Sequence, residues 1–287
     1  MRSSVSVVLC VKNVEDEIRE CILSIKKNIF FEIVIVDGKS NDKTVQIAKE
    51  LGVKKIISDD GRGLPYARQL GVSNTSGDQI LFFGSDNVMS KGFIDSFVKL
   101  KVEAGFDAAT VKTRVGNPIN AWDKGLDFRW KCLGEDQTKN VNVVGTPSMY
   151  SRSVFDYCEF TEGSHTSDDA DLALQMERKN LSIGMIDLLV FDKNNTTFRS
   201  TYGRFKWYGE GDFYFYKNNQ DSWTANRKFK SITHPFRQSV LYSYRALTSH
   251  SSLSIGWLVV TLIARYHGWI SEIFKNKYCQ PCLKRDL

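Results

Sequence analysis

Apolar positions in the first two hundred residues follow two alternating patterns. Short, nearly continuous apolar runs rich in Val, Ile and Phe are typical of buried strands, and they fall at Val5–Val11, Glu32–Asp37, Lys54–Ser58 and Gln79–Gly84. Segments with apolar residues at helical spacing separate these runs, at Val14–Lys27, Asp42–Leu51 and Leu64–Ser73. This repetition predicts an α/β fold with a mostly parallel, Rossmann-like sheet that is flanked by helices on both faces.

The pattern continues and then changes near residue 195. Later strands are expected at Ala108–Arg114, Val141–Ser151 and Ile183–Val190, and a helix at Asp168–Lys179. The chain has no internal repeat and no low-complexity linker. We therefore expect a first domain over residues 1–195 and a basic, aromatic, helical C-terminal extension over residues 196–287.

The excess positive charge lies in the C-terminal fifth of the chain. All 287 residues together carry 39 Lys and Arg against 33 Asp and Glu, a net charge of +6. Residues 226–287 hold ten bases and two acids, a net charge of +8, which leaves −2 for residues 1–225. A segment of this kind is suited to nucleic acid or to an anionic membrane surface.

Cysteine usage and the first apolar run indicate a cytoplasmic setting. The six cysteines are too few and too scattered for a disulfide scaffold. The run Val5–Val11 is short and leads directly into charged residues, so we expect a buried strand and not an export signal. Cys279-Gln280-Pro281-Cys282 has no second pair at metal-ligand spacing, and we assign it no role.

Polar residues follow three of the predicted strands where each strand ends. They are Lys12-Asn13, Asp37-Gly38-Lys39-Ser40 and Gly84-Ser85-Asp86-Asn87. Each group alone is explained by the ordinary composition of turns. Because ligands of parallel sheets bind beyond the carboxyl ends of the strands, the three groups together predict a binding crevice.

Five motifs then occur in one order over residues 4–190. They lie in Val8–Glu15, Val34–Thr44, Gly63–Asp78, Phe82–Asn87 and Asp168–Leu172. In this order they resemble the opening strand with its N-E-E loop, the V-D-G-G-S-x-D-G-T, G-x-x-x-A-R-N-x-G and F-L-D-S-D-D segments, and the E-D-x-D-L motif of family 2 glycosyltransferases. The resemblance implies a GT-A fold and the inverting transfer of a sugar from a nucleotide-diphosphate donor.

The resemblance also implies a donor site. A carboxylate at Asp37 can accept hydrogen bonds from a nucleobase or ribose, and Gly38 allows close backbone approach. Arg68 can add a guanidinium to the diphosphate, with a solvated helix-face arginine as the alternative. The expected donor-binding residues are Val11, Asn13, Glu15, Asp37, Gly38, Arg68, Ser85, Asp86, Arg204 and Lys206.

A divalent cation is expected between Asp86 and the donor. Hard oxygen ligands suit Mg²⁺ or Mn²⁺, and such a cation stabilises the departing diphosphate as a Lewis acid. The family has its first acid at the position of Gly84, so only Asp86 supplies a carboxylate and Asn87 adds a neutral oxygen. We expect Asp86 and Asn87 as the metal ligands.

Inverting transfer needs a base for the proton of the acceptor hydroxyl. Asp169 matches the second acid of E-D-x-D-L and is the expected catalytic residue, whereas Asp168 and Asp171 can simply complement the dipole of the helix that they begin. Thr146, Asp168 and Trp207 are expected on the acceptor side. Trp207 stands with Arg204 and Lys206 in a basic-aromatic segment, whose alternative is an amphipathic helix that packs its aromatic side chains on the core.

Leu253–Phe274 is predicted to be an amphipathic helix. Its polar residues and one glycine form a narrow stripe, Ser254, Thr261, Arg265, Gly268 and Glu272, which leaves a wide apolar face that includes Trp257 and Trp269. The apolar run is too short to cross a bilayer of roughly 30 Å. With basic flanks, it predicts a helix at a membrane surface, and the alternatives are docking on the core or a dimer interface.

The expected function is therefore a glycosyltransferase in cell-surface polysaccharide or glycoconjugate synthesis. Its acceptor is lipid-linked or a glycan, and it works in the cytoplasm, peripherally on the inner face of the membrane. Nucleic acid is disfavoured as a partner because the basic segment is also the most apolar. The alternatives are a noncatalytic nucleotide-sugar-binding or scaffold protein, motivated by Gly84, and a nucleotidyltransferase, which lacks its G-x-G-x-R-x-x-P-x-x-K-like loop.

Overall fold

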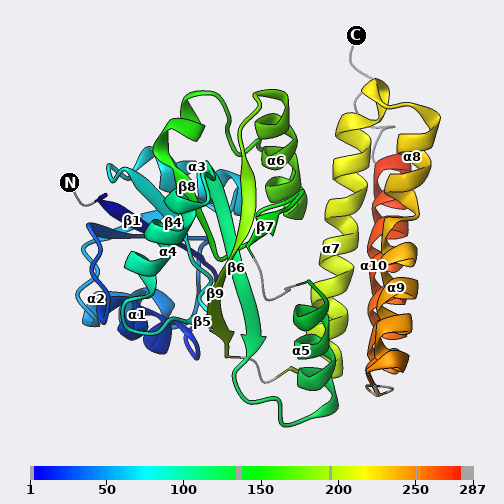
Figure 1. The fold of residues 1–287 in the computed structure, drawn as a ribbon, viewed down its shortest axis with the longest axis horizontal. Helices are drawn as coiled ribbons and strands as arrows, with labels where there is room; N and C mark the ends of the chain where they lie inside the picture. Colours follow the sequence, from blue (N-terminus) through cyan, green and yellow to red (C-terminus); the bar gives the residue numbers. More distant parts are fainter. Residues whose placement is uncertain (1–2, 134–137, 194–195, 250, 252, 279–287) are drawn as a thin grey trace. The chain divides into compact units, whose positions relative to one another are not determined.

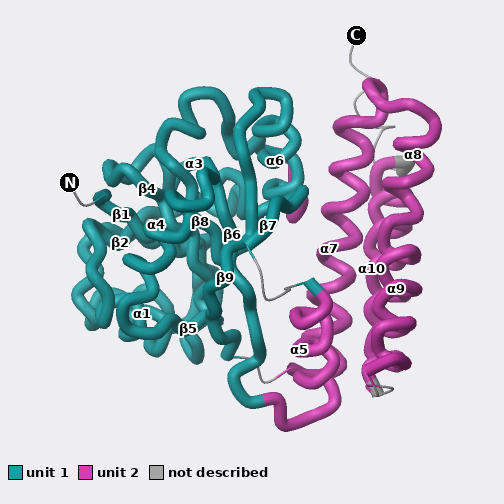
Figure 2. The backbone as a smooth tube through the Cα atoms, in the orientation of Figure 1, with its two compact units in different colours: residues 1–117, 133–162, 168–194 teal, residues 118–132, 163–167, 195–287 magenta. Residues whose placement is uncertain are grey.

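A computed structural model describes residues 3–133, 138–193, 196–249, 251 and 253–278 of the chain (Figure 1). The Cys279–Cys282 motif lies outside the described residues. The chain forms two compact units (Figure 2). The first comprises residues 1–117, 133–162 and 168–194, and the second comprises residues 118–132, 163–167 and 195–287.

The first unit is built on a mixed sheet that has nine strands in the described part of the chain. The order is β3-β2-β1-β4-β8-β6-β9-β5, and β7 pairs with β9. The pairs among β1 to β4 and the pair β6–β9 are parallel, whereas β5, β7 and β8 run antiparallel to their neighbours. The strands are β1 (Val5–Val11), β2 (Glu32–Asp37), β3 (Lys55–Ser58), β4 (Gln79–Phe82), β5 (Asn87–Val88), β6 (Ala108–Val115), β7 (Lys139–Asn140), β8 (Ser148–Ser151) and β9 (Ile183–Asp192).

Helices cover both faces of this sheet, because its central strands are apolar on both sides. In β1, Val7 and Leu9 belong to one core cluster and Val8 to another. The first cluster includes side chains of α1 (Ile18–Lys26), α2 (Thr44–Glu50) and α4 (Phe93–Glu103). The second includes side chains of α3 (Leu64–Ser73) and α6 (Asp168–Arg178). Two cores, one on each face, are what buried parallel strands require.

The carboxyl ends of β1, β2 and β4 meet at one edge of the sheet. Val11 pairs with Asp37 at the ends of β1 and β2. The amide of Phe83, directly after β4, donates to the carbonyl of Val8 at 3.0 Å. Because β8 is antiparallel to β4 and its first residue, Ser148, pairs with Phe82, the segment before β8 lies at this same edge. This edge is where an open α/β sheet binds its ligand.

The second unit is helical. Its α-helices are α5 (Ala121–Leu133), α7 (Phe198–Asn219), α8 (Ala225–Ile232), α9 (His234–Thr248) and α10 (Leu253–Tyr278). Short 3₁₀ helices lie at His165–Ser167 and Gln220–Ser222 in this unit and at Arg152–Asp156 in the first unit. Helices α7 and α10 cross with their backbones in contact: a Cβ on Gly209 would lie 1.8 Å from the carbonyl oxygen of Arg265, and one on Gly268 would lie 1.9 Å from that of Lys206. Glycine is required at both positions.

The expected fold class is confirmed, and two expectations about elements are corrected. Residues 141–147 do not continue the strand expected at Val141–Ser151, which is reduced to Ser148–Ser151. In the polar stripe on α10, Ser254, Thr261 and Glu272 are buried and the side chain of Arg265 is 15% exposed. Trp257 and Trp269 are buried too, at 4% and 9% exposed. These tryptophans therefore do not belong to an outward apolar face. No helix among the described residues combines the length and the apolar character needed to span a bilayer.

Candidate functional site

The loops that follow β1 and β2 are joined by a set of local hydrogen bonds. Asn13 has a φ of 53°, a left-handed conformation that asparagine tolerates. Its backbone amide donates to Ser40 Oγ at 2.9 Å, and its side-chain Oδ1 accepts from the backbone amide of Asn41 at 2.9 Å. Glu15 Oε2 accepts from the amide of Lys43 at 3.0 Å. The predicted donor residues Asn13 and Glu15 thus lie directly beside the loop that Asp37 begins.

Asp37 is held at the end of β2. It is 8% exposed, and its Oδ2 accepts from the amide of Ser40 at 3.1 Å. The amide of Gly38 donates to the carbonyl of Val11 at 2.8 Å. The carboxylate is therefore fixed by the turn, at the edge where ligands bind.

The third polar group, after β4, contains the residues expected to hold a cation. Asp86 is half-buried and Asn87 is 4% exposed. The side-chain Nδ2 of Asn87 donates to Asp192 Oδ1 at 2.6 Å. This hydrogen bond orients the side-chain oxygen of Asn87. A Cβ built on Gly84 would lie 2.6 Å from Oδ1 of Asp86 and 2.6 Å from Oδ1 of Asn87. The two oxygens therefore converge on the space that the side chain of an acid at position 84 would enter.

Two oxygens do not make a closed metal cage. Among the described residues no three or more His, Cys, Asp and Glu side chains are grouped to hold an ion. Mg²⁺ at phosphate-transfer sites is commonly held by one or two protein oxygens together with the phosphates of the substrate. Burial, followed by the negative charges of Asp16 and Asp86, raises the pKa of nearby Glu17. The side chains available to a metal ion at this place thus offer only oxygen atoms and carry negative charge. They fit a hard cation that arrives with a diphosphate.

The start of α6 is fixed by a buried ion pair. Arg68 Nη1, on α3, lies 2.8 Å from Asp168 Oδ2, and the two side chains are 12% and 1% exposed. Arg68 Nη2 donates to Thr146 Oγ1 at 2.9 Å. Burial alone would lower the pKa of Arg68, but the negative charges of Asp168 and Asp169 outweigh it and raise that pKa. The guanidinium of Arg68 therefore joins α3, α6 and the segment before β8. In the described structure its terminal nitrogens contact Asp168 and Thr146 and not a diphosphate.

Asp169 lies beside this pair, and only one of its two oxygens has a partner in the described hydrogen bonds. Its Oδ1 accepts from the amide of Ala170 at 2.8 Å. Its Oδ2 lies on the side of Gly145, where a Cβ would approach it to 3.7 Å. Burial, and then the negative charge of Asp168, raise the pKa of Asp169 to about 6, although Arg68 opposes this. A carboxylate with that pKa is ionised at neutral pH and is still basic enough to take a proton.

The remaining predicted residues divide between the units. Ser85 belongs to the first unit and is half-buried beside Asp86. Arg204, Lys206 and Trp207 belong to α7 of the second unit, where Lys206 Nζ pairs with Glu210 Oε1 at 2.7 Å and Trp207 is 40% exposed. Their expected roles toward the donor and acceptor stay predictions.

Two partners of the site were not found from the sequence. Asp192, at the end of β9, orients Asn87 from more than a hundred residues away. The pairing of Arg68 with Asp168 joins two motifs that were considered separately. The strand expected at Ile183–Val190 extends to Asp192 in the structure. A polar residue just beyond a predicted strand was therefore the available signal for Asp192.

Comparison with known sequences gives a consistent family. The profile described as "Glycosyl transferase family 2" matches residues 6–158. Glycosyltransferase GlyA of Streptococcus pneumoniae is 31% identical over 156 residues, which is 51% of this chain and 21% of that protein. A dolichyl N-acetyl-alpha-D-glucosaminyl phosphate 3-beta-D-2,3-diacetamido-2,3-dideoxy-beta-D-glucuronosyltransferase of Methanococcus voltae is 31% identical over 34% of this chain and 35% of that protein. The match thus spans well under half of these two relatives.

Solved structures share the fold at low sequence identity. S. aureus TarS 1-349, solved with UDP-GlcNAc, superposes with a TM-score of 0.56 at 14% identity, over 96% of this chain and 92% of that one. Glucosyl-3-phosphoglycerate synthase of Mycobacterium tuberculosis, solved with Mg²⁺ and UDP, has a TM-score of 0.56 at 18% identity, over 75% of this chain and 79% of that one. The family profile covers more than half of the sequence, and the fold agrees with it. This chain belongs to glycosyl transferase family 2.

Proposed function

We propose that this protein transfers a sugar, with inversion, from a nucleotide-diphosphate donor to a hydroxyl group of a lipid-linked or glycan acceptor. The observation that carries the proposal is the position of Asp169. Its Oδ2 faces the Gly145 segment, next to the Arg68–Asp168 pair. That segment lies at the edge of the sheet where Asp37 and Asp86 follow their strands. A base and a donor-binding edge are the two components that the reaction needs.

The reaction uses Asp169 as the general base. As the acceptor hydroxyl oxygen forms its bond to the anomeric carbon, its proton passes to Asp169 Oδ2. The bond between the anomeric carbon and the diphosphate oxygen breaks, and the electron pair leaves with the nucleoside diphosphate. Attack from the face opposite the leaving group inverts the configuration. The second oxygen of Asp169, held by the amide of Ala170, keeps the carboxylate in one orientation.

The donor is held by the loops after β1, β2 and β4. Asp37 accepts hydrogen bonds from the base or ribose, and the backbone around Val11, Asn13 and Gly38 lets the nucleotide approach closely. The local hydrogen bonds of Asn13 and Glu15 support this role, because they hold the two loops in one arrangement before a ligand binds. Ser85 supplies a hydroxyl beside the diphosphate.

Asp86 and Asn87 would hold a Mg²⁺ or Mn²⁺ ion. The convergence of their Oδ1 atoms on the space at Gly84 supports this assignment. When bound, such an ion supplies Lewis-acid stabilisation of the charge that develops on the diphosphate. Asp192 positions Asn87 through the amide nitrogen and leaves the amide oxygen for the cation.

The acceptor class rests on the family and on the surface of the second unit. The relative from Methanococcus voltae carries a dolichyl-linked phosphate sugar in its name. Thr146 and Asp168, beside Asp169 in the first unit, would face the acceptor. We place the enzyme in the cytoplasm, peripherally at the inner face of the membrane, where lipid-linked acceptors for cell-surface polysaccharide and glycoconjugate synthesis are found.

The experiment is a donor screen followed by a transfer assay. Thermal shift with a panel of nucleotide sugars identifies the donor, and the same labelled donor is then incubated with the protein and extracted lipid. We expect one donor to stabilise the protein, and label to enter the lipid fraction with inverted anomeric configuration. A donor that binds without any transfer to lipid or glycan would contradict an enzymatic role, and retention of configuration would exclude a single displacement assisted by Asp169.

A further inference from the structure

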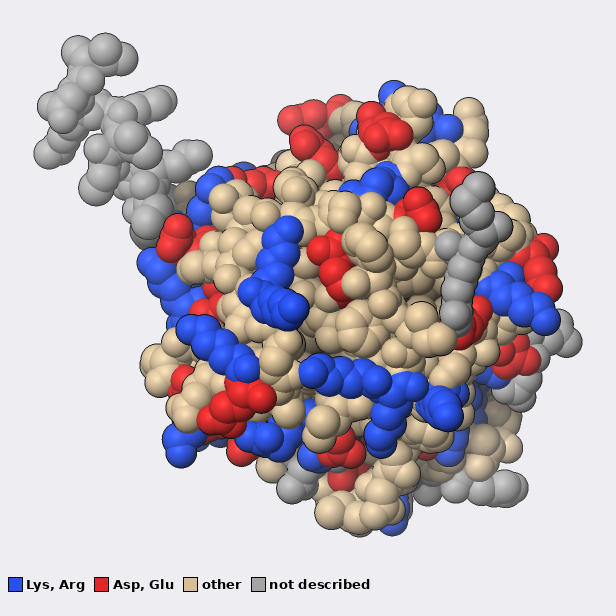
Figure 3. All heavy atoms as spheres, turned by 90° about the vertical axis from the view of Figure 1, so that its left-hand side faces the viewer, with Lys and Arg blue, Asp and Glu red and all other residues tan. Residues whose placement is uncertain are grey.

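The chain has no acidic residue between Asp221 and Glu272, a stretch that contains α8, α9 and most of α10. Within α8 and α9 it carries five bases, Arg227, Lys228, Lys230, Arg237 and Arg245. On the face of the molecule in Figure 3, by contrast, Asp and Glu side chains stand between the Lys and Arg side chains. The second unit therefore has a locally unbalanced positive charge.

Helix α8 has no buried residue, yet it is strongly amphipathic. Ala225, Phe229 and Ile232 fall on one side at helical spacing, and Phe229 is 65% exposed. Arg227 and Lys230 fall on the opposite side. Packing within the described structure therefore does not explain why a phenylalanine stands at this exposed position of α8.

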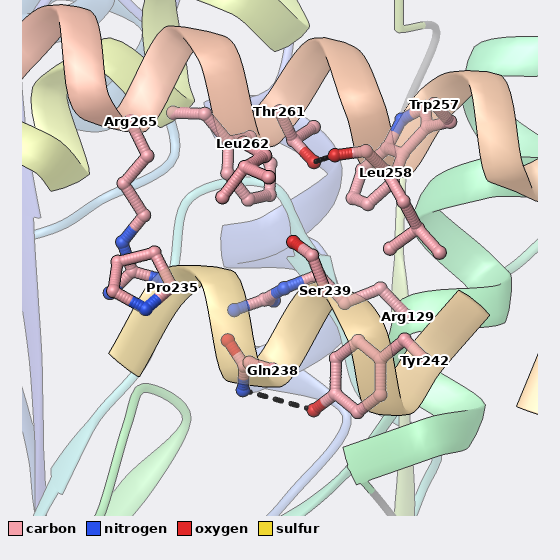
Figure 4. A pocket seen from close by; sticks show the side chains of 11 residues that line it. Arg129, Pro235, Gln238, Ser239, Tyr242, Trp257, Leu258, Thr261, Leu262 and Arg265 are labelled. Atoms are coloured by element: carbon pink, nitrogen blue, oxygen red, sulfur yellow. Dashed lines mark hydrogen bonds between the residues drawn. The ribbon is translucent and has the colours of Figure 1, made fainter. Parts of the chain in front are cut away.

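Helix α9 buries Pro235, Tyr242 and Ala246 on its inner side and exposes large apolar side chains on its outer side. Gln238, Ser239 and Tyr242 line a small pocket against α10 (Figure 4), and Gln238 Nε2 donates to the hydroxyl of Tyr242 at 3.1 Å. The outward stripe is apolar and its members follow one another at spacings of four, four and three residues: Phe236, Val240, Tyr244 and Leu247, which are 54%, 54%, 66% and 61% exposed. A helix whose outer side faces water carries polar residues on that side.

The two helices are fixed to each other. Arg237 Nη2, on α9, donates to the carbonyl of Lys230 near the end of α8 at 2.8 Å. The hydroxyl of Tyr266, on α10, donates to the carbonyl of Ile232 at 3.0 Å. The apolar side chains of α8 and α9 are therefore presented by a braced pair of helices and not by a loose tail.

Helix α10 also directs polar side chains into the unit and exposes some of its aliphatic ones. Arg265 forms a two-point ion pair with Asp212 of α7, in which Nη2 lies 2.8 Å from Oδ1. Glu272 Oε2 accepts from the hydroxyl of Tyr214 at 2.9 Å. Val259 and Ile263, meanwhile, are 50% and 57% exposed. Arg265 and Glu272 of α10 bind inside the unit, where Trp257 and Leu258 are also buried, and only part of its aliphatic side chains, including Val259 and Ile263, is exposed.

We infer that the outer faces of α8 and α9 form a docking surface for an anionic lipid bilayer. This docking face consists of Phe229, Ile232, Phe236, Val240, Tyr244 and Leu247, flanked by Arg227, Lys228, Lys230 and Arg237. Half-exposed aromatic and aliphatic side chains insert among the acyl chains, and the bases meet the headgroups. The inference deepens the proposed membrane-associated function and rests on it, but it changes the contact from α10 to α8 and α9.

Charge favours a bilayer over the other occupants of such a surface. A second copy of this chain would bring two acid-free basic faces together, and like charges across an interface are unfavourable. Nucleic acid would leave the apolar stripe of α9 without a partner. An anionic membrane satisfies both the charge and the apolar groups.

The test uses surface substitutions in the full chain, because removal of α10 would expose the buried face of α7 around Gly209. Flotation with vesicles of phosphatidylcholine and 30% phosphatidylglycerol compares the wild type with Phe236→Ser/Val240→Ser and with Lys228→Glu/Lys230→Glu. Matched controls are Phe31→Ser/Val102→Ser, which are 60% and 61% exposed in the first unit, and Lys27→Glu/Lys54→Glu. Far-UV circular dichroism and thermal unfolding check that each variant is folded.

We expect the wild-type protein and both control variants to float with anionic vesicles and to bind pure phosphatidylcholine more weakly. Their binding to anionic vesicles should weaken, but not vanish, as salt rises. The Phe236/Val240 variant should lose roughly tenfold or more in partitioning, and the Lys228/Lys230 variant should lose its preference for anionic lipid. Wild-type protein that fails to float, or controls that lose as much as the α9 variant, would overturn the inference. So would a wild-type dimer by light scattering that the α9 variant converts to monomer. Flotation needs neither donor nor acceptor, so its failure is distinct from failure of sugar transfer.

Discussion

The guanidinium of Arg68 and the carboxylate of Asp168 form an ion pair, 2.8 Å from Nη1 to Oδ2, that is almost fully removed from solvent. It joins α3 to the first residue of α6, so the helix starts at a fixed place relative to the sheet. Asp169 is the next residue, and its pKa responds to both charges of the pair. The position and the basicity of the proposed base are therefore set by a residue about a hundred positions earlier in the chain.

Replacing Arg68 by Met should alter both stability and the pH profile. Breaking one half of a buried pair leaves Asp168 without its cation, at a cost of about 3–5 kcal/mol in the free energy of unfolding. Since the charge of Arg68 lowers the pKa of Asp169, its loss should move the acidic limb of the rate profile above about pH 6. Arg68→Lys keeps the charge and should restore the limb in part. Urea unfolding and kcat/KM against pH measure the two effects, and an unmoved limb in Arg68→Met would separate Arg68 from the base.

The wild-type rate should fall as the pH drops through about 6. A general base acts only when it is deprotonated, and burial together with Asp168 raises the pKa of Asp169 to about 6. The carboxylate is thus mostly ionised at pH 7.5 and mostly protonated at pH 5. Asp171→Asn is a matched control on the same helix, because Asp171 accepts only from Gln175 in the described hydrogen bonds. Its profile should overlay the wild type, and a wild-type rate independent of pH between 5 and 8 would argue against a carboxylate base.

Asp37→Ala and Asp86→Ala should both weaken nucleotide-diphosphate binding while the fold survives. Asp37 is expected to contact the base or ribose and Asp86 the cation, so only Asp86→Ala should abolish stimulation by Mn²⁺ or Mg²⁺. Calorimetry with a nucleoside diphosphate, with and without metal, gives both results. Metal-stimulated binding that persists in Asp86→Ala would remove the cation from this residue.

Gly209→Ala should destabilise the second unit. The new Cβ would lie 1.8 Å from the carbonyl oxygen of Arg265, so α7 and α10 must move apart, which costs about 1–3 kcal/mol or more. Gly203 lies on the same helix with nothing within 4 Å of its Cβ position, so Gly203→Ala should instead stabilise by up to about 1 kcal/mol. Thermal unfolding of the two variants compares them directly, and equal shifts would contradict the close crossing.

Local pattern was enough to predict the sheet and most of the helices of the first unit. The strand at Val5–Val11 and the helix at Leu64–Ser73 have the predicted bounds, because continuous apolar runs and helical spacing are read from neighbouring residues. Helices α4 and α5 were not predicted. Residues 141–147 were expected to be strand but are not, since pairing with β4 and β6 uses only Ser148–Ser151.

What could not be predicted depends on contacts distant in sequence. A single sequence gives no sign that Asp168 and Thr146 contact the nitrogens of Arg68. The expected contact of Arg68 with the diphosphate stays a prediction. The direction of α10 was also beyond reach. Its amphipathic pattern was expected to present an apolar face with Trp257 and Trp269 to a membrane surface. Both tryptophans are buried instead, and Arg265 and Glu272 find partners on α7. An amphipathic pattern fixes two faces and not which of them is buried.

The most direct test of the central claim is turnover by Asp169→Asn at pH 7.5, with the affinity for the donor measured on the same sample. The substitution keeps the shape of the side chain and removes its basicity. We predict that sugar transfer falls by roughly 10²–10⁴-fold while the dissociation constant of the donor changes little. Turnover within a few-fold of the wild type would contradict the account and would move the base elsewhere, with Asp168 the next candidate.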